Sequence, residues 1–155
     1  MKKIMLFSVL GIALDQATKY IISIVLELGE SISIIPNFFH FTYVRNFGAA
    51  FSILNGNRLF FIIIGLFALV AIYYLFLKNK KLNTLEIGTY SLLISGILGN
   101  LLDRIIRGYV VDFFDFTIFG YHFPIFNIAD ICIVLAVAFI LYTIIKEEKH
   151  GNHSN

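Results

Sequence analysis

The sequence has few charged residues, one cysteine and no tryptophan. Only 14% of its 155 residues are charged, whereas soluble domains have about 25%. Apolar residues make up 59%, and the mean hydropathy is +0.86. This composition excludes a water-soluble globule, and the many aromatic residues exclude disorder. One cysteine, Cys132, can form neither an internal disulfide nor a thiolate metal site. The net charge of +2 gives no reason to expect a nucleic-acid partner.

Four apolar stretches are each long enough to cross a bilayer, which takes about 20 helical residues. They run approximately over residues 4–26, 59–77, 85–106 and 128–145. Because no water is available at that depth to bind free backbone groups, these stretches are predicted to be helices. We therefore expect an all-α membrane protein with four transmembrane helices, built as one integral membrane domain over residues 1–155.

The lysines predict the orientation of these helices. If the helices alternate in direction, seven lysines fall on one side of the membrane: Lys2, Lys3, Lys78, Lys80, Lys81, Lys146 and Lys149. Basic residues that flank membrane spans gather on the cytoplasmic side, so both termini are predicted to be cytoplasmic. The N-terminal stretch has features of a cleavable signal peptide, but its apolar run continues past Lys19 to Leu26. We interpret it as a retained transmembrane helix.

The two outer segments, residues 27–58 and 107–127, are less polar than ordinary loops. Polar and apolar residues alternate over Ser31–Ile34 and His40–Tyr43, and the second segment is dense in aromatic and β-branched residues. We expect a small extracytoplasmic β-rich part that lies on the membrane surface. Residues 147–155 are expected to form a solvated, frayed tail.

The first helix contains two opposite charges near its middle, Asp15 and Lys19. Insertion scales assign each a cost of about 2.5 to 3.5 kcal/mol. Four residues apart, they share a helix face and can pair. Two interpretations stay open: a neutralised pair that only lets the helix insert, or a pair that lines a polar cavity beside Gln16 and orients other groups there.

The third helix carries a polar stripe near its outer end. Spacing of three to four residues places on one face Gly96, Asn100, Asp103, Arg104 and Arg107. Arg107 is interpreted as an interfacial end cap, whereas Asn100 and Arg104 lie too deep for that role. Small residues at a spacing of four, which permit close helix contact in lipid, are Ser91, Ser95 and Gly99.

Two acids follow, Asp112 in the outer segment and Asp130 at the start of the fourth helix. Two carboxyl groups beside an apolar phase are costly unless one keeps its proton, and a pair that shares one proton can act as base and acid together. The helix dipole favours the anion at Asp130, so Asp112 is expected to hold the proton more often. Asn127 is also placed to cap the fourth helix. Spacing alone does not bring the two acids together, and Asp115 is a competitor.

Three other functions compete on the residues alone. A cysteine protease would need Cys132 and His122, but Cys132 points to a helix face nearly opposite Asp130 and is interpreted as a small buried apolar residue. A metalloprotease needs close histidines, whereas His40 and His122 are interpreted as surface strand residues. Intramembrane charges also mark transporters and channels, but the sequence has no internal repeat.

Five sequence blocks, in order, carry a resemblance to a known family. They are Asp15-Gln16-Ala17-Thr18-Lys19, Arg45-Asn46-Phe47-Gly48-Ala49-Ala50-Phe51, Gly99-Asn100-Leu101-Leu102-Asp103-Arg104, Val110-Val111-Asp112-Phe113 and Phe123-Pro124-Ile125-Phe126-Asn127-Ile128-Ala129-Asp130. With these blocks and four spans, the sequence resembles the lipoprotein signal peptidases, or signal peptidase II, of bacterial membranes.

The resemblance implies an intramembrane aspartyl endopeptidase that removes the signal peptide of diacylglyceryl-modified prolipoproteins just before the lipidated cysteine. It implies catalytic roles for Asp112 and Asp130. The positions implied to bind substrate are Asn46, Gly48, Asn100, Arg104, Asn127 and Ala129, and those implied to be polar structural residues are Asp15, Lys19 and Asp103. The expected partners are lipidated prolipoproteins, membrane lipid and inhibitors of the globomycin type. We expect no cofactor, no metal and no nucleic acid, and a monomer in the bacterial cytoplasmic membrane with its site toward the outer face.

Overall fold

The computed structural model describes residues 1–48 and 56–151, with side chains described as far as Lys146 within the last helix. Ala49, Ala50 and Phe51, which belong to the second sequence block, lie outside the described residues.

Four helices in the described part of the chain are long and apolar enough to cross a membrane, as the sequence predicts. They are α1 (Lys2–Val25), α2 (Arg58–Ile72) with its π-helical extension η2 (Tyr73–Leu77), α3 (Thr84–Ile106) and α4 (Ile128–Gly151). The expected frayed tail is wrong in part, because α4 remains helical to Gly151. No proline interrupts that stretch, and Lys and Glu are good helix formers.

Helix α3 occupies the centre of the bundle. It packs against α1, α2 and α4, and 44% of its apolar window is buried, compared with 6% for the second span. Its start is fixed by a capping box: Asn83 Oδ1 accepts from the Glu86 backbone N–H at 3.0 Å, and Glu86 Oε2 accepts from the Asn83 N–H at 2.7 Å. Because α3 packs against the other three helices, polar groups at its end next to the sheet can reach side chains of each of them.

The bundle buries polar residues and exposes apolar ones. Buried polar side chains include Ser8, Asp15, Lys19, Ser91, Ser95, Asn100 and Asp103. Large apolar side chains of α1 and α2 are exposed, as expected for surfaces that contact lipid. The small residues of α3 permit the predicted close contacts, since a Cβ on Gly99 would lie 2.6 Å from Asp15 Oδ2.

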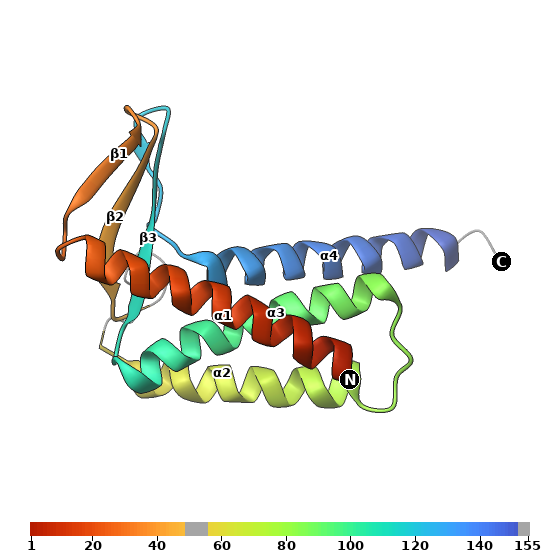
Figure 1. Ribbon diagram of the computed structural model, residues 1–155. Helices are drawn as coiled ribbons and strands as arrows, with labels where there is room; N and C mark the ends of the chain where they lie inside the picture. The colour runs from red at the N-terminus through yellow and green to blue at the C-terminus, as the bar shows by residue number, and fades with distance from the viewer. Residues whose placement is uncertain (49–55, 152–155) are drawn as a thin grey trace.

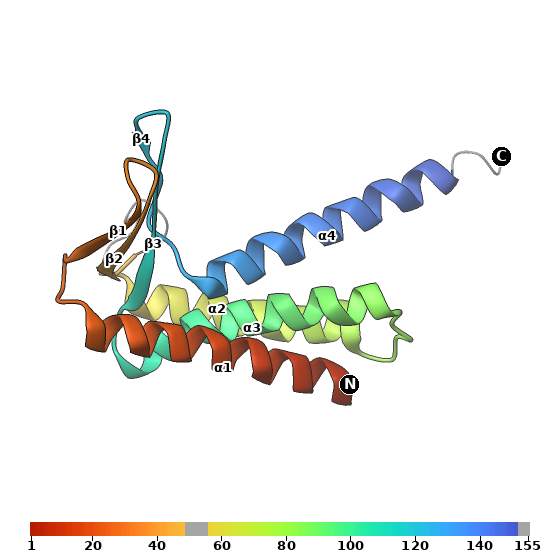
Figure 2. The ribbon, with the colours of Figure 1, turned by 45° about the horizontal axis from the view of Figure 1, so that its top comes forward.

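A four-stranded antiparallel sheet lies at one end of the bundle (Figure 1). Its strands pair in the order β1 (Ser31–Ile35), β2 (Phe39–Asn46), β3 (Val110–Ile118) and β4 (Tyr121–His122). The two windows of alternating residues lie in β1 and β2, so the predicted strands are confirmed. The start of α1 and the last turn of α4 both lie at the opposite end of the bundle, and α4 diverges from the other helices toward its last turn (Figure 2).

The sheet has an aromatic face next to the start of α4. The rings of Phe39 and Phe116 stack with centroids 4.5 Å apart, and those of Phe116 and Phe126 with centroids 5.8 Å apart. Phe126 lies just before α4, and its backbone oxygen accepts from the N–H groups of Phe113 and Phe114 at 3.0 and 2.8 Å. This backbone link fixes the beginning of α4 against β3.

Candidate active site

Asp112 projects from β3 into the junction between the sheet and the helices. Its neighbours in the strand, Val111 and Phe113, are 0% and 2% exposed, and Asp112 itself is 3% exposed. Each of its carboxylate oxygens accepts one amide hydrogen bond: Oδ2 from Asn46 Nδ2 at 2.9 Å and Oδ1 from Asn127 Nδ2 at 2.6 Å. The donors belong to two different segments, so the position of Asp112 depends on the tertiary fold.

Asn127 and Asp130 cap the first turn of α4 reciprocally. Asn127 Oδ1 accepts from the Asp130 backbone N–H at 3.0 Å, and Asp130 Oδ2 accepts from the Asn127 N–H at 3.2 Å. The predicted capping role of Asn127 is therefore confirmed, and the Asp130 carboxylate lies at the positive end of the helix dipole. Because Asn127 also binds Asp112, this one residue brings both aspartates together.

The electrostatics raise the pKa of Asp112 into the neutral range. Burial, and then the negative charge of Asp130, raise the pKa of Asp112 to about 7. The hydrogen bonds from Asn46 and Asn127 and the charge of Lys19 act in the opposite direction, because they stabilise the carboxylate. A carboxyl group with this pKa can donate a proton at physiological pH.

The competitor, Asp115, lies elsewhere on the sheet. Its Oδ2 accepts from Thr42 Oγ1 at 2.7 Å, and Thr42 Oγ1 lies 2.9 Å from Ser31 Oγ. In the strand register, Asp115 pairs with His40. The geometry thus brings Asp112, and not Asp115, to Asn127.

Asn100 links Asp130 to α1. Its Nδ2 donates to Asp130 Oδ1 at 2.7 Å, and its Oδ1 accepts from Lys19 Nζ at 3.0 Å and from Asn127 Nδ2 at 3.2 Å. The side chain of Asn100 therefore makes its hydrogen bonds within the protein.

Lys19 is the centre of a buried group of charges. Its Nζ lies 2.9 Å from Asp15 Oδ2 and 3.0 Å from Asp103 Oδ2, and Asp103 Oδ1 lies 2.7 Å from Arg107 Nη1. Two cations and two anions balance one another, which offsets the cost of burying them. Asp15 and Lys19 form the neutralised pair of the first interpretation, and Lys19 also contacts Asp103 and Asn100, as the second interpretation expects of a pair that orients other groups. Both side chains are buried, with exposures of 0% for Lys19 and 1% for Asp15, rather than lining an open cavity.

Backbone groups complete the polar region. Asp103 Oδ2 accepts from the Val111 N–H at 3.2 Å, and Asp15 Oδ1 accepts from the Ala129 N–H at 2.9 Å. Gln16 Nε2 lies within hydrogen-bond distance of both Asp15 and Asp103. Every buried side-chain nitrogen or oxygen in the described part of the chain has a hydrogen-bond partner, so the region is pre-organised.

Arg104, Gly48 and Ala129 differ in their surroundings. Arg104 Nη2 donates to the Gly48 carbonyl at 2.9 Å, and its guanidinium group lies 4.8 Å from the ring centroid of Phe61. Ala129, expected among the substrate-binding positions, is 1% exposed and packs between helices. Ala129 therefore contributes to the packing of α4 against α3, where it lies next to Gly96 and Gly99.

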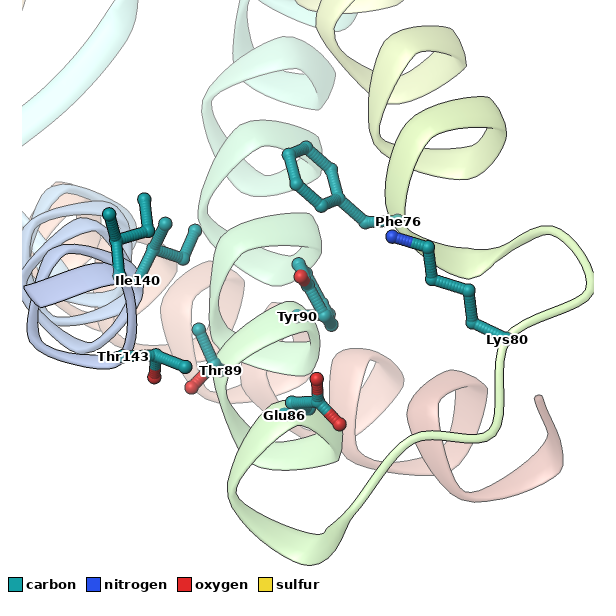
Figure 3. Close-up of a pocket in the computed structure, with 8 residues that line it drawn as sticks. Phe76, Lys80, Glu86, Thr89, Tyr90, Ile140 and Thr143 are labelled. Atoms are coloured by element: carbon teal, nitrogen blue, oxygen red, sulfur yellow. The ribbon is translucent and has the colours of Figure 1, made fainter. Parts of the chain in front are cut away.

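A cavity of about 190 Å³ lies near the other end of the bundle (Figure 3). Its lining includes Phe76, Tyr90, Thr89, Ile140 and Thr143, from η2, α3 and α4. It contains neither Asp112 nor Asp130, so we do not assign it to the site.

Comparison with known proteins identifies the family. A family model described as signal peptidase (SPase) II matches residues 7–146. The chain belongs to the signal peptidase II family. The resemblance stated from the five sequence blocks is confirmed, and membership makes this chain a peptidase and a multi-pass membrane protein.

Individual relatives and solved structures are also similar to this signal peptidase II chain. A lipoprotein signal peptidase of Staphylococcus aureus (strain JH9) is 45% identical over 142 residues, which cover 92% of this chain and 87% of the relative. A bacterial membrane enzyme solved by the in meso method at 2.3 Å superposes with a TM-score of 0.89 at 42% identity, covering 97% of this chain and 92% of the other. A second such structure, at 1.9 Å, gives a TM-score of 0.84 at 43% identity, with 94% of each chain covered.

Sequence reasoning missed one structural determinant of the signal peptidase II site. Phe126 accepts two backbone hydrogen bonds from β3, next to Asp112, and is followed by the cap of α4.

Proposed function

We propose that this chain is a lipoprotein signal peptidase with an aspartyl mechanism. It removes the signal peptide from diacylglyceryl-modified prolipoproteins and cuts just before the lipidated cysteine. Membership of the signal peptidase II family and the similarity to lipoprotein signal peptidases support the substrate class. The arrangement of Asp112 and Asp130 supports the mechanism.

One observation carries the proposal: Asp112 from β3 and Asp130 from α4 both hydrogen-bond to Asn127. The two carboxyl groups come from separate elements and are linked through Asn127, where β3 pairs with the segment before α4. Each also receives one further amide hydrogen bond, Asp112 from Asn46 and Asp130 from Asn100. Asp130 also raises the pKa of Asp112 through its charge, so one carboxyl group is suited to act as the acid while the other acts as the base.

The pair acts on the peptide bond through water. The ionised aspartate, Asp130, removes a proton from a water molecule as its oxygen attacks the scissile carbonyl carbon. Asp112 donates its proton to the carbonyl oxygen. When the carbon–nitrogen bond breaks, Asp130 gives the proton it took from water to the departing amine, and Asp112 takes a proton back from a hydroxyl group of the tetrahedral intermediate. The pair thus returns to its starting state, and no covalent bond to the enzyme forms. The raised pKa of Asp112, about 7, suits it to the donor role.

The position of the site fits a substrate that is anchored in lipid. Asp112 lies in β3 and Asp130 in the first turn of α4, and these elements lie at the end of the bundle away from the start of α1 and the last turn of α4 (Figure 1). With the termini in the cytoplasm, this end lies at the outer face of the membrane, and a diacylated substrate reaches it sideways through the outer leaflet. Inhibitors of the globomycin type are expected to occupy the same site in the monomer.

The test is cleavage of a lipidated prolipoprotein by purified protein in detergent. We expect Asp112→Asn and Asp130→Asn each to lower the rate by about 10²- to 10⁴-fold or more, the range of general acid–base catalysis. Both variants should remain folded and membrane-inserted. Asp115→Asn is the matched control on the same strand and should keep its activity. Full activity in either active-site variant would overturn the mechanism.

The same assay tests the substrate class. The unlipidated form of the prolipoprotein should not be cleaved, and globomycin should inhibit cleavage of the lipidated form. Equal cleavage of both forms would contradict a lipid requirement while leaving the aspartyl mechanism in place.

A further inference from the structure

We propose that Lys19 is a positioning residue for catalysis, which acts on Asp130 through the side chain of Asn100. The inference rests on the proposed function, because it assigns a cause to the placement of one catalytic carboxylate. Lys19 lies on α1, 81 residues from Asn100 on α3, and its side chain is 0% exposed.

The ammonium group of Lys19 fixes which end of the Asn100 amide faces it. Nζ has three N–H donors and no acceptor. Its three partners are Asp15 Oδ2, Asp103 Oδ2 and Asn100 Oδ1, at 2.9, 3.0 and 3.0 Å. The end of the amide that faces Lys19 must therefore be oxygen. The NH₂ end then faces Asp130 and donates to its Oδ1 at 2.7 Å.

The contacts of Asn127 agree with this polarity. Its Oδ1 accepts from the Asp130 N–H, so its NH₂ group faces Asn100 Oδ1 and Asp112 Oδ1. If the Asn100 amide turned over, its NH₂ group would oppose the donors of Lys19 and Asn127. Its oxygen would then oppose the carboxylate of Asp130. Since no solvent reaches Lys19, no water would replace the lost hydrogen bonds.

Lys19 thus has an effect beyond neutralising its acidic neighbours. It makes the Asn100 amide donate to Asp130, and so holds that carboxylate where it can accept a proton from water. A purely structural lysine would only balance the charges of Asp15 and Asp103. Arg107 provides the comparison, because it binds Asp103 as Lys19 does and lies on the far side of that carboxylate, with Nη1 2.7 Å from Oδ1.

The experiment is a double-mutant cycle with Lys19→Met and Asn100→Leu, and with Arg107→Met as the control. Lys19→Met should lower kcat roughly ten- to a hundredfold, as the loss of a residue that orients a functional group typically does. It should leave KM unchanged, because Lys19 does not bind the substrate. Arg107→Met should keep its kcat. The double variant should be no slower than the slower single variant, because both changes remove the same oriented hydrogen bond.

Two outcomes would overturn the inference. If the effects of Lys19→Met and Asn100→Leu on kcat multiply, Lys19 acts independently of Asn100, for example through its charge alone. If Arg107→Met lowers kcat as much as Lys19→Met does, the loss follows from an unbalanced Asp103.

Folding is controlled with a second variant. Lys19→Met leaves two buried carboxylates without their ammonium partner, which destabilises the protein. If it does not fold, Lys19→Met combined with Asp15→Asn, compared with Asp15→Asn alone, measures the same effect with less unpaired charge. An active Asp112→Asn or Asp130→Asn variant would reject the proposed function itself. Inactive aspartate variants with an unaffected Lys19→Met would reject only this inference.

Discussion

The Asp112 carboxyl group shows how single residues tune the site. It is buried on a strand, yet each oxygen accepts a hydrogen bond from an amide of another segment. Burial favours its neutral form, and the amides favour its charged form. The balance puts its pKa at about 7, so small changes in the surrounding donors should alter activity near neutral pH.

At this scale we predict the alkaline limb of the pH profile. If Asp112 must be protonated to donate, kcat/KM should fall as the pH rises through about 7, where Asp112 loses its proton. The measurement is kcat/KM for the lipidated substrate against pH. If kcat/KM stays constant from about one pH unit below this pKa to about two units above it, Asp112 is not the proton donor.

Replacing Asn46 should shift the fall of kcat/KM to higher pH. Asn46 Nδ2 donates to Asp112 Oδ2 and stabilises the carboxylate. In Asn46→Leu this bond is lost, so the pKa of Asp112 should rise and the fall in kcat/KM should occur at higher pH. Thr42→Val is the control, because it removes a hydrogen bond from the same strand to Asp115. A limb that moves to lower pH would refute this role of Asn46.

At the scale of elements, the close contact of α3 with α4 positions Asp130. A Cβ on Gly96 would collide with the Ala129 carbonyl oxygen and lie 2.6 Å from Ile133 Cγ1. One of these contacts is with backbone, so the helices would have to separate. Asp130 is next to Ala129, and a shift of α4 would carry it away from Asn100 on α3, whose Nδ2 donates to Asp130 Oδ1.

We therefore predict that Gly96→Val lowers both stability and activity. Overpacking of this kind costs about 1 to 3 kcal/mol. Thermal unfolding in detergent measures the stability, and the cleavage assay measures the activity. Gly88→Ala is the matched control on α3, because nothing lies within 4 Å of the added Cβ. It should be neutral, or stabilising by up to about 1 kcal/mol, since Gly is unfavourable within a helix. A fully active Gly96→Val variant would show that this contact does not position Asp130.

At the scale of the molecule, the distribution of polar and apolar side chains suits a membrane. Large apolar side chains of α1 and α2 are exposed, and charges lie inside near the sheet. The start of α1 and the last turn of α4 lie at the end away from the sheet (Figure 1). With lysines flanking the helix ends there, the whole molecule is predicted to have one orientation in the bilayer.

Labelling with a membrane-impermeant maleimide tests this orientation. In a Cys132→Ser background, which should be fully active because Cys132 is a small buried side chain, single cysteines are placed at two exposed positions. Ser33→Cys, on β1, should be labelled in intact cells, and Lys3→Cys, at the start of α1, only after permeabilisation. The reverse pattern would place the termini outside and contradict the proposed side of the site.

The sequence by itself determined the four helices, the strands and the set of polar residues available for chemistry. Long apolar runs must form helices in lipid, and alternation favours strands, because these patterns depend on the solvent and on local hydrogen bonds. Such patterns act over a few residues. The sequence patterns therefore determined which side chains each helix or strand carries, but not which side chains of different elements come into contact.

Only the tertiary structure decided which groups meet. Asp112 and Asp130 are 18 residues apart, and Asp115 had an equal claim until the pairing of Phe126 with β3 brought Asp112 to Asn127. The direction of the Asn100 amide depends on a lysine 81 residues away. Contacts of this kind depend on how separate elements pack. In the buried interior no water can bond to a polar group, so each donor there must face an acceptor from another part of the chain.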